Sequence, residues 1–273
     1  MRLRLDSRPQ ALTIVRGMLS GVAEQLALDP ELLDDLKTAV SEACNNVVLH
    51  AYAADVIGLM DVSLSVDDDV IRVTVVDDGL GLPPASALPE LPEGIGVSVI
   101  RALTTEAFFG ARPQGGTEVR MDFAGRRGGQ ALFRAPPPPA PDDDLAPPSD
   151  GEVVVSLSPV TLLAGVLGRL ARTLAATAHF SLDRFSDVYL VTDTLAAHAA
   201  SAAATDRISA VVSARDRRLE LAVGPFRAGT GSRLEVRTAR HAASPLVLLS
   251  DEVSVIPDGD AERLQVVVID HRR

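Results

Sequence analysis

Ala39-Val-Ser-Glu-Ala-Cys-Asn-Asn-Val-Val-Leu-His-Ala-Tyr52 is the stretch on which the expected fold depends. It reads as part of one helix that starts at Pro30, after the capping residue Asp29, and runs to about Ala53. Apolar residues recur along it at helical spacing and predict one buried face: Leu36, Val40, Ala43 and Val47. A second stripe, polar and one turn apart, lies beside that face: Glu42, Asn46 and His50.

This polar stripe has two interpretations. A carboxylate, an amide and an imidazole at the edge of a core most often form a half-buried border that contacts solvent. The alternative is the wall of a binding or catalytic site. The single cysteine, Cys44, lies among small apolar residues of the same helix, and we interpret it as a buried hydrophobic residue rather than a nucleophile.

The segments around this helix predict an α/β fold. A short strand over residues 3–7 and an apolar helix carrying Arg16 precede it. Two alternating β-branched runs follow it, residues 59–66 and 70–76, and predict a hairpin. The second strand ends at Asp77-Asp-Gly79-Leu-Gly81, where a carboxylate stands beside bare backbone that a polar ligand can approach.

Two further glycine signals follow. After a proline-rich loop over residues 82–93, Gly94-Ile-Gly96 opens an apolar helix, where free N–H groups can face an anion. Gly115-Gly-Thr117 then forms the turn before a last strand that ends at Phe123. A lone G-x-G is most often a simple turn, so its meaning depends on the other signals.

Together these four signals, in this order, resemble the N box and the three glycine boxes of the Bergerat-fold (GHKL) ATPases. Ser41-Glu-Ala-Cys-Asn-Asn46 followed by His50-Ala-Tyr52 is similar, more narrowly, to the bacterial anti-sigma factor serine/threonine kinases. The resemblance covers about residues 3–123. It implies a two-layer α/β sandwich that binds ATP and Mg²⁺.

The resemblance also implies a role for each matching residue. Glu42 would be the general base that takes the proton of a serine hydroxyl, and Asn46 would hold the Mg²⁺ that bridges the phosphates. Asp77 would accept a hydrogen bond from the adenine amino group. Other residues would shape the pocket, its lid and its adenine side: Gly79, Gly81, Gly94, Gly96 and Thr117. Arg16 matches an arginine with which the family contacts protein partners.

Composition limits the class of partner. The 273 residues carry a net charge of -11 without a dense basic run, and aromatic residues make up only 3%. Nucleic acid is therefore not an expected partner. The N-terminus lacks a signal-peptide pattern, and no apolar run approaches the roughly 20 residues that span a bilayer. We therefore expect a cytoplasmic protein without a membrane partner.

A proline- and aspartate-rich segment, residues 126–150, divides the chain into two halves. Its composition predicts a semi-rigid linker between a kinase-like domain, residues 1–125, and a second domain, residues 151–273. Strand and helix patterns recur in the second half in the same order, so we expect a degenerate second copy of the same sandwich. Sliding the helices together places Asp193 at the Glu42 position and Ala197 at the Asn46 position, so we expect no nucleotide site there.

Three functions fit this pattern. The first is an ATP-binding anti-sigma regulator that holds a sigma factor and phosphorylates an anti-anti-sigma partner on serine or threonine. The second is a non-catalytic ATP-binding adaptor that docks proteins through an intramolecular pseudo-dimer. The third is a GHKL ATPase of another pathway. Ile95 stands between the lid glycines where many relatives carry a basic residue, and this keeps the second function open.

Overall fold

A computed structural model describes residues 1–67, 69–81, 95–124, 148–231 and 244–271. The chain forms two compact units, Met1–Pro147 and Pro148–Arg273. Most of the expected linker, together with the proline-rich loop and Gly94, lies outside the described residues. Each unit is described below by itself.

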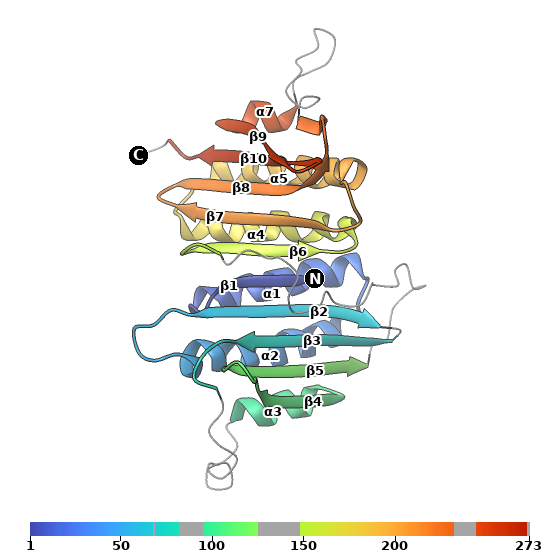
Figure 1. The fold of residues 1–273 in the computed structure, drawn as a ribbon, viewed down its shortest axis with the longest axis vertical. Coiled ribbons are helices and arrows are strands. Elements are labelled where there is room, and N and C mark those ends of the chain that lie inside the picture. Colours follow the sequence, from blue (N-terminus) through green and yellow to red (C-terminus); the bar gives the residue numbers. More distant parts are fainter. Residues whose placement is uncertain (68, 82–94, 125–147, 232–243, 272–273) are drawn as a thin grey trace. The chain divides into compact units, whose positions relative to one another are not determined.

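The first unit is an antiparallel sheet with helices on one of its faces (Figure 1). Its strands lie in the order β4-β5-β3-β2-β1. In chain order its elements are β1 (Arg2–Asp6), α1 (Gln10–Gln25), α2 (Pro30–Asn46), a π-helical turn (Val47–Ala51), β2 (Leu59–Asp67), β3 (Val70–Asp77), α3 (Ile95–Leu103), β4 (Glu106–Ala111) and β5 (Thr117–Ala124). This mixed α/β architecture agrees with the expected fold class.

Alternation of side chains explains the two layers. In β2 and β3 every second residue is buried, which turns one face of the sheet toward the helices. The central buried strand residues are Val62, Leu64, Val73 and Val75. Helix α2 packs against β3 and β5 on this face of the sheet. As predicted, α2 begins at Pro30, and the Asp29 carboxylate accepts a hydrogen bond from the Glu31 N–H at 2.9 Å.

The end of α2 differs from the prediction. Regular helix stops at Asn46, and Val47–Ala51 forms a π-helical turn instead of continuing to Ala53. A π turn holds more residues than an α turn, so the side chains that follow rotate away from the original stripes. His50 is exposed as a result, and its expected place at the edge of the core is wrong. Only Glu42 and Asn46 keep the predicted helical relation.

The second unit contains the same order of elements. They are β6 (Glu152–Leu157), a 3₁₀ turn (Val160–Leu162), α4 (Leu163–Thr177), α5 (Leu182–Ala202), β7 (Ile208–Arg215), β8 (Arg218–Arg227), α7 (Pro245–Leu249), β9 (Glu252–Asp258) and β10 (Ala261–Ile269). Its strands lie in the order β9-β10-β8-β7-β6. Each strand therefore occupies the position in its sheet that the corresponding strand holds in the first unit.

The pattern of buried residues aligns α5 with α2, and this alignment differs by one residue from the alignment expected from the sequence. α5 begins at Leu182 as α2 begins at Pro30, and the buried residues then fall at matching distances from the two starts. In α2 they are Leu36, Ala39, Val40, Ala43 and Cys44, and the first five in α5 are Val188, Val191, Thr192, Leu195 and Ala196. This register places Thr194 at the Glu42 position and His198 at the Asn46 position, one residue beyond Asp193 and Ala197.

One helical stretch of the described residues is long and apolar enough to cross a membrane. It is Val160–Thr177, with a mean hydropathy of 1.3 over 18 residues, so the expectation that no apolar run approaches this length is too strong. The stretch is 56% buried within the protein. Its buried residues include Val166, Leu167 and Leu170, which pack in the core of the second unit. A core helix explains this composition.

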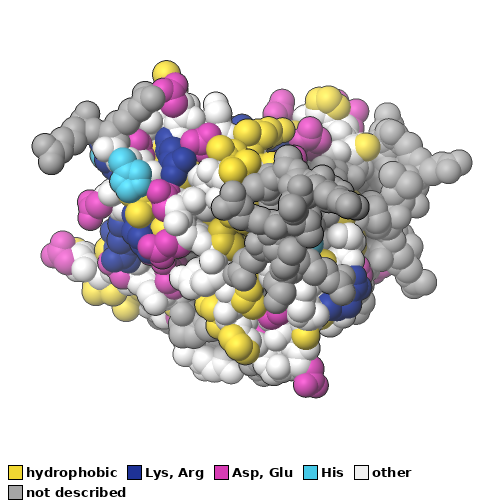
Figure 2. Space-filling view, turned by 90° about the horizontal axis from the view of Figure 1, so that it is seen from above, with side chains coloured by type: hydrophobic (Ala, Val, Ile, Leu, Met, Phe, Trp, Pro, Cys, Tyr) yellow, Lys and Arg dark blue, Asp and Glu magenta, His cyan; other side chains and the backbone are white. Residues whose placement is uncertain are grey.

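Charged side chains of both signs are interspersed on the face shown in Figure 2, where Lys and Arg side chains lie among Asp and Glu side chains. Ion pairs in the second unit show the same mixing. Arg184 pairs with Asp187 at 2.8 Å and with Asp251 at 2.5 Å, and Arg218 pairs with Glu220 at 2.6 Å. Pairs of this kind leave little net positive field for a polyanion.

Candidate functional site

The last turns of α2 carry the first part of the candidate site. Glu42 and Asn46 lie one helical turn apart, both partly exposed. Gly96, in the first turn of α3, packs against both: a Cβ at this glycine would lie 2.9 Å from Glu42 Oε2 and 3.6 Å from Asn46 Oδ1. The structure thus brings three predicted residues from two motifs together, beside the N-terminus of α3.

The side chains of Glu42 and Asn46 have no hydrogen-bond or ion-pair partner within the residues that the structure describes. A carboxylate and an amide oxygen in this state can accept a proton or bind a cation. The neighbouring α3 N-terminus adds N–H groups, which favour negative charge nearby. This end of α2 therefore has the donor and acceptor types that a magnesium-bound phosphate chain requires.

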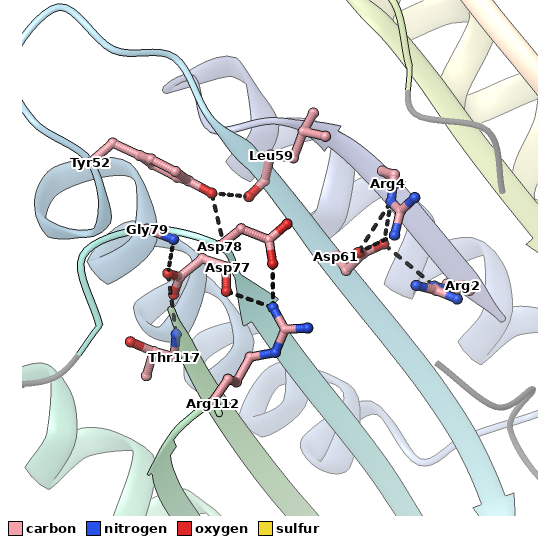
Figure 3. A network of polar contacts seen from close by, with 10 residues as sticks. All are labelled: Arg2, Arg4, Tyr52, Leu59, Asp61, Asp77, Asp78, Gly79, Arg112 and Thr117. Carbon is pink, nitrogen blue, oxygen red and sulfur yellow. Dashed lines mark hydrogen bonds and ion pairs between the residues drawn. The ribbon is translucent and has the colours of Figure 1, made fainter. Parts of the chain in front are cut away.

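Asp77 forms the second part of the site. It is the last residue of β3, and only 3% of it is exposed. Its Oδ1 accepts two backbone hydrogen bonds, from the Gly79 N–H at 2.9 Å and from the Thr117 N–H at 3.3 Å (Figure 3). Within the described residues no donor reaches its Oδ2. The carboxylate is thus oriented through one oxygen and can accept a hydrogen bond through the other.

Burial raises the pKa of Asp77 above its ordinary value, while the N–H groups of Gly79 and Thr117 lower it in part. Burial is the larger of these effects because it removes water from the charged form. An aspartate that is buried at a cost in this way is a candidate functional group.

Close backbone approach explains the glycines near Asp77. A Cβ at Gly79 would lie 2.0 Å from the Ala51 carbonyl oxygen, and the Leu80 N–H donates to the same oxygen at 2.7 Å. This contact joins the Asp77 loop to the π turn that follows Asn46. Gly81, with φ at +76°, would bring a Cβ to 3.2 Å from the Gly116 carbonyl oxygen. Gly79 and Gly81 therefore shape the backbone around the carboxylate.

Replacement of Gly116 by Ala is expected to destabilise the first unit by about 2 to 4 kcal/mol. Its Cβ would lie 1.9 Å from the Asp77 carbonyl oxygen, and its φ is +85°. Gly229→Ala is a matched control, since its φ is +80° but nothing lies within 4 Å of its Cβ. Urea unfolding should show the larger loss for Gly116→Ala; equal losses would contradict the steric argument.

Two residues with no predicted role also contact the Asp77 loop. The Tyr52 hydroxyl donates to the Leu59 carbonyl oxygen at 2.5 Å and accepts from the Asp78 N–H at 3.1 Å. Arg112 donates to the Asp77 carbonyl oxygen at 3.0 Å and forms an ion pair with the Asp78 carboxylate (Figure 3). Tyr52 stands at the end of the opening stretch, whereas no sequence signal distinguishes Arg112.

The remaining predicted residues have these positions. Thr117 contacts Asp77 through its backbone N–H, at the start of β5. Arg16 is exposed on α1, and its guanidinium donates to the Ser41 hydroxyl at 3.1 Å, next to Glu42 in sequence. Gly94 lies outside the described residues.

The first unit is similar in sequence to known proteins. Residues 5–123 match the family described as "Histidine kinase-like ATPase domain". The chain is 38% identical over 79 residues to "Serine-protein kinase RsbW" of Bacillus licheniformis, covering 29% of this chain and 49% of that protein. It thus spans about half the length of the first curated relatives that it matches. It is 32% identical over 130 residues to "Anti-sigma F factor" of Caldanaerobacter subterraneus subsp. tengcongensis, covering 44% of this chain and 90% of that protein.

Among solved structures, the "Histidine kinase domain from Erythrobacter litoralis EL346 blue-light activated histidine kinase" matches with 29% identity and a TM-score of 0.30, covering 34% of this chain and 45% of that chain. The family match and the anti-sigma F factor identify the family of this chain, because nearly the whole of that relative is covered. The chain belongs to the histidine kinase-like (GHKL) ATPase family, in its anti-sigma kinase-like group.

Proposed function

We propose that this protein is an ATP-binding anti-sigma regulatory factor with serine/threonine protein kinase activity toward an anti-anti-sigma partner. The observation that supports this most is the continuous site of the first unit. Glu42 and Asn46 adjoin Gly96 at one end, and the π turn leads through Ala51 and Gly79 to Asp77 at the other. Motif residues that are far apart in sequence are therefore joined by direct contacts within one part of the first unit.

Each group in this site has a chemical role. Bound Mg-ATP supplies the phosphoryl group and the cation that neutralises the phosphate charge. Asn46 would provide a protein oxygen to the cation, since Mg²⁺ takes few protein ligands when phosphates and water complete its shell. Glu42 would accept the proton of the substrate hydroxyl. Asp77, through Oδ2, would accept a hydrogen bond from the adenine amino group.

The proposed protein partners follow from the family. The relatives named above are a serine-protein kinase and an anti-sigma factor. We assign partner contact to the exposed Arg16, which lies on α1 beside the helix that carries Glu42. Since these functions operate on bacterial regulators and ATP, we place the protein in the cytoplasm.

A non-catalytic ATP-binding adaptor is the second candidate. Ile95 supports it, because this residue is 86% exposed at the start of α3 and carries no charge that could contact a phosphate. A protein of this type would bind Mg-ATP and hold its partner without phosphate transfer. Incubation of the captured partner with radiolabelled ATP separates the two candidates, since only a kinase transfers label to a serine or threonine.

We further propose that the chain consists of a kinase-like domain, residues 1–125, a linker, residues 126–150, and a degenerate second copy, residues 151–273. The shared order of elements and of strands supports the second copy. When the β7–β8 hairpin is aligned with the β2–β3 hairpin, Pro225 takes the place of Asp77 and is followed by the buried Phe226. When α5 is aligned with α2 by their buried residues, His198 takes the place of Asn46. Neither replacement offers a carboxylate, so this copy would serve in pairing or in docking proteins.

A cavity of about 370 Å³ in the second unit fits this interpretation. It is lined by His198, Ser201, Ala202, Arg227, Ala228 and Thr230. Both hydroxyl groups of its lining bond to the chain itself: the Ser201 hydroxyl donates to the His198 carbonyl oxygen at 3.0 Å, and the Thr230 hydroxyl donates to the Arg227 carbonyl oxygen at 2.6 Å. These hydroxyl protons are therefore engaged in holding the fold, and we expect no Mg-ATP there.

Replacement of Asn46 by Ala is expected to remove magnesium-dependent ATP binding, because it deletes the proposed protein ligand of the cation. The wild type at 100 times the dissociation constant of Mg-ATP should gain about 2.7 kcal/mol of stability, measured as a thermal shift. Asn45→Ala, on the same helix, is the matched control and should keep this shift. A wild-type protein with no shift at millimolar Mg-ATP would refute the proposed function.

A further inference from the structure

The loop that carries Asp77 is held by side chains from two other elements. Asp77 and Asp78 stand where β3 ends, so the position of the Asp77 carboxylate depends on the backbone of these two residues. The bonds to its Oδ1 come from this same loop and from β5. Tyr52 and Arg112 contact the backbone beside it, and Asp78 links both of them (Figure 3).

Tyr52 connects three segments through one hydroxyl. It follows the π turn in extended conformation, and its hydroxyl bridges the first residue of β2, Leu59, to the Asp78 N–H. Burial raises the pKa of this hydroxyl, so it stays protonated and donates while it accepts. Gly58 allows the ring to lie here, since a Cβ at that position would be 2.0 Å from the ring atoms Cε1 and Cζ.

Arg112 holds the same loop from the turn between β4 and β5. Its Nη1 donates to the Asp77 carbonyl oxygen at 3.0 Å and pairs with the Asp78 carboxylate. The backbone of Arg112 is itself fixed, because its N–H donates to the Gly116 carbonyl oxygen and its carbonyl oxygen accepts from the Gly115 N–H, both at 3.1 Å. The guanidinium is therefore attached to the turn that precedes Thr117.

We propose that Tyr52 and Arg112 are positioning residues that give the site its selectivity for adenine over guanine. Adenine presents an amino group where guanine presents a carbonyl oxygen, so a carboxylate discriminates between them by accepting from the first and repelling the second. A carboxylate that can shift loses part of this discrimination. The inference rests on the proposed function, because it assumes that Asp77 faces the base.

The test compares the binding of ATP, GTP and inorganic tripolyphosphate, each with Mg²⁺, by titration calorimetry. Tyr52→Phe and Arg112→Gln should each weaken ATP binding by about threefold to tenfold, the effect of a lost hydrogen bond. GTP and tripolyphosphate binding should change little, so the ATP-to-GTP affinity ratio falls. Arg112→Lys should recover only part of the ratio, since an ammonium cannot reproduce the fork of a guanidinium.

Matched controls separate positioning from general damage. Tyr189→Phe and Arg72→Gln remove the same groups at places away from the loop, on α5 and on the outer face of β3, and should leave the ratio unchanged. Gly58→Ala keeps the hydroxyl but displaces the ring, and should lower the ratio as Tyr52→Phe does. An unchanged ratio in the Tyr52 and Arg112 variants, or an equal loss for all three ligands, overturns this inference alone. Absence of ATP binding by the wild type overturns the proposed function and this inference with it.

Discussion

Glu42→Gln is expected to lower the rate of phosphate transfer by at least about 100-fold while ATP binding stays within about twofold of the wild type. The amide keeps the size of the side chain but cannot take a proton from a serine hydroxyl. Glu42 lies beside Gly96 at the start of α3, and a glutamine fits the same space. Single-turnover transfer of labelled phosphate to the captured partner measures the rate, and calorimetry measures ATP binding.

Thr194 and Asp193 provide the control for this experiment. Thr194 holds the Glu42 position in the second unit, and Asp193 next to it is exposed on α5. Asp193→Asn removes a carboxylate from the second unit and should leave the rate unchanged. If Glu42→Gln keeps the wild-type rate, another group is the base or the transfer needs none, and the proposed role of Glu42 is wrong.

Asp77→Asn is expected to weaken ATP binding by about 100-fold, or about 2.7 kcal/mol. The asparagine Oδ1 can still accept from the Gly79 and Thr117 N–H groups, so the loop keeps its shape. The Nδ2 group then replaces Oδ2 and presents a donor to the adenine amino group, which is also a donor. Titration calorimetry checks this loss, and unchanged ATP affinity would refute the proposed contact with the base.

The same variant has a pH signature. The folded-state pKa of Asp77 is raised, so the folded state binds a proton more readily than the unfolded state. Stability contributed by this group therefore falls as pH rises from its ordinary value near 4 through the raised value. Asp77→Asn should remove this slope and be at least as stable as the wild type at neutral pH, with the difference vanishing below about pH 4.

Asp122 provides a control of opposite sign. Its carboxylate lies on β5 and accepts from the Arg72 guanidinium at 2.7 Å, and this bond lowers its pKa. Asp122 therefore stabilises the folded state above its ordinary pKa, and that stability is lost as pH falls through the lowered value. Asp122→Asn should destabilise the protein at neutral pH and leave ATP binding unchanged. Urea unfolding between pH 3 and 8 compares the two variants.

Local patterns were sufficient for the elements and for most of the candidate site. The capping residue Asp29, the apolar spacing of α2 and the alternation in β2 and β3 are short-range signals, and the structure agrees with them. Glu42 and Asn46 could be chosen because helix geometry alone places them one turn apart. The glycines at positions 79 and 81 could be chosen because glycine lets the backbone beside a carboxylate turn tightly and be approached closely.

The errors arose where neighbouring elements change a local pattern. The π turn after Asn46 removed His50 from its stripe, and the register of α5 differs by one residue from the alignment by sequence. In both cases the helical pattern repeats every three to four residues, so an alignment shifted by one residue fits the sequence almost as well as the correct one. The buried side chains resolve it, because only one register packs Val188, Val191 and Leu195 against the sheet.

The amino-acid sequence by itself determined the helix with Glu42 and Asn46, the strand ending at Asp77 and the glycine turns, because each depends on residues a few positions apart. Only the tertiary structure decided that Gly96 lies against Glu42, that Gly79 lies against Ala51, and that Tyr52 and Arg112 hold the loop of Asp77. These contacts join segments up to 54 residues apart, as Glu42 and Gly96 are. Their geometry is set by how the sheet and helices pack, and no short stretch of sequence contains that information.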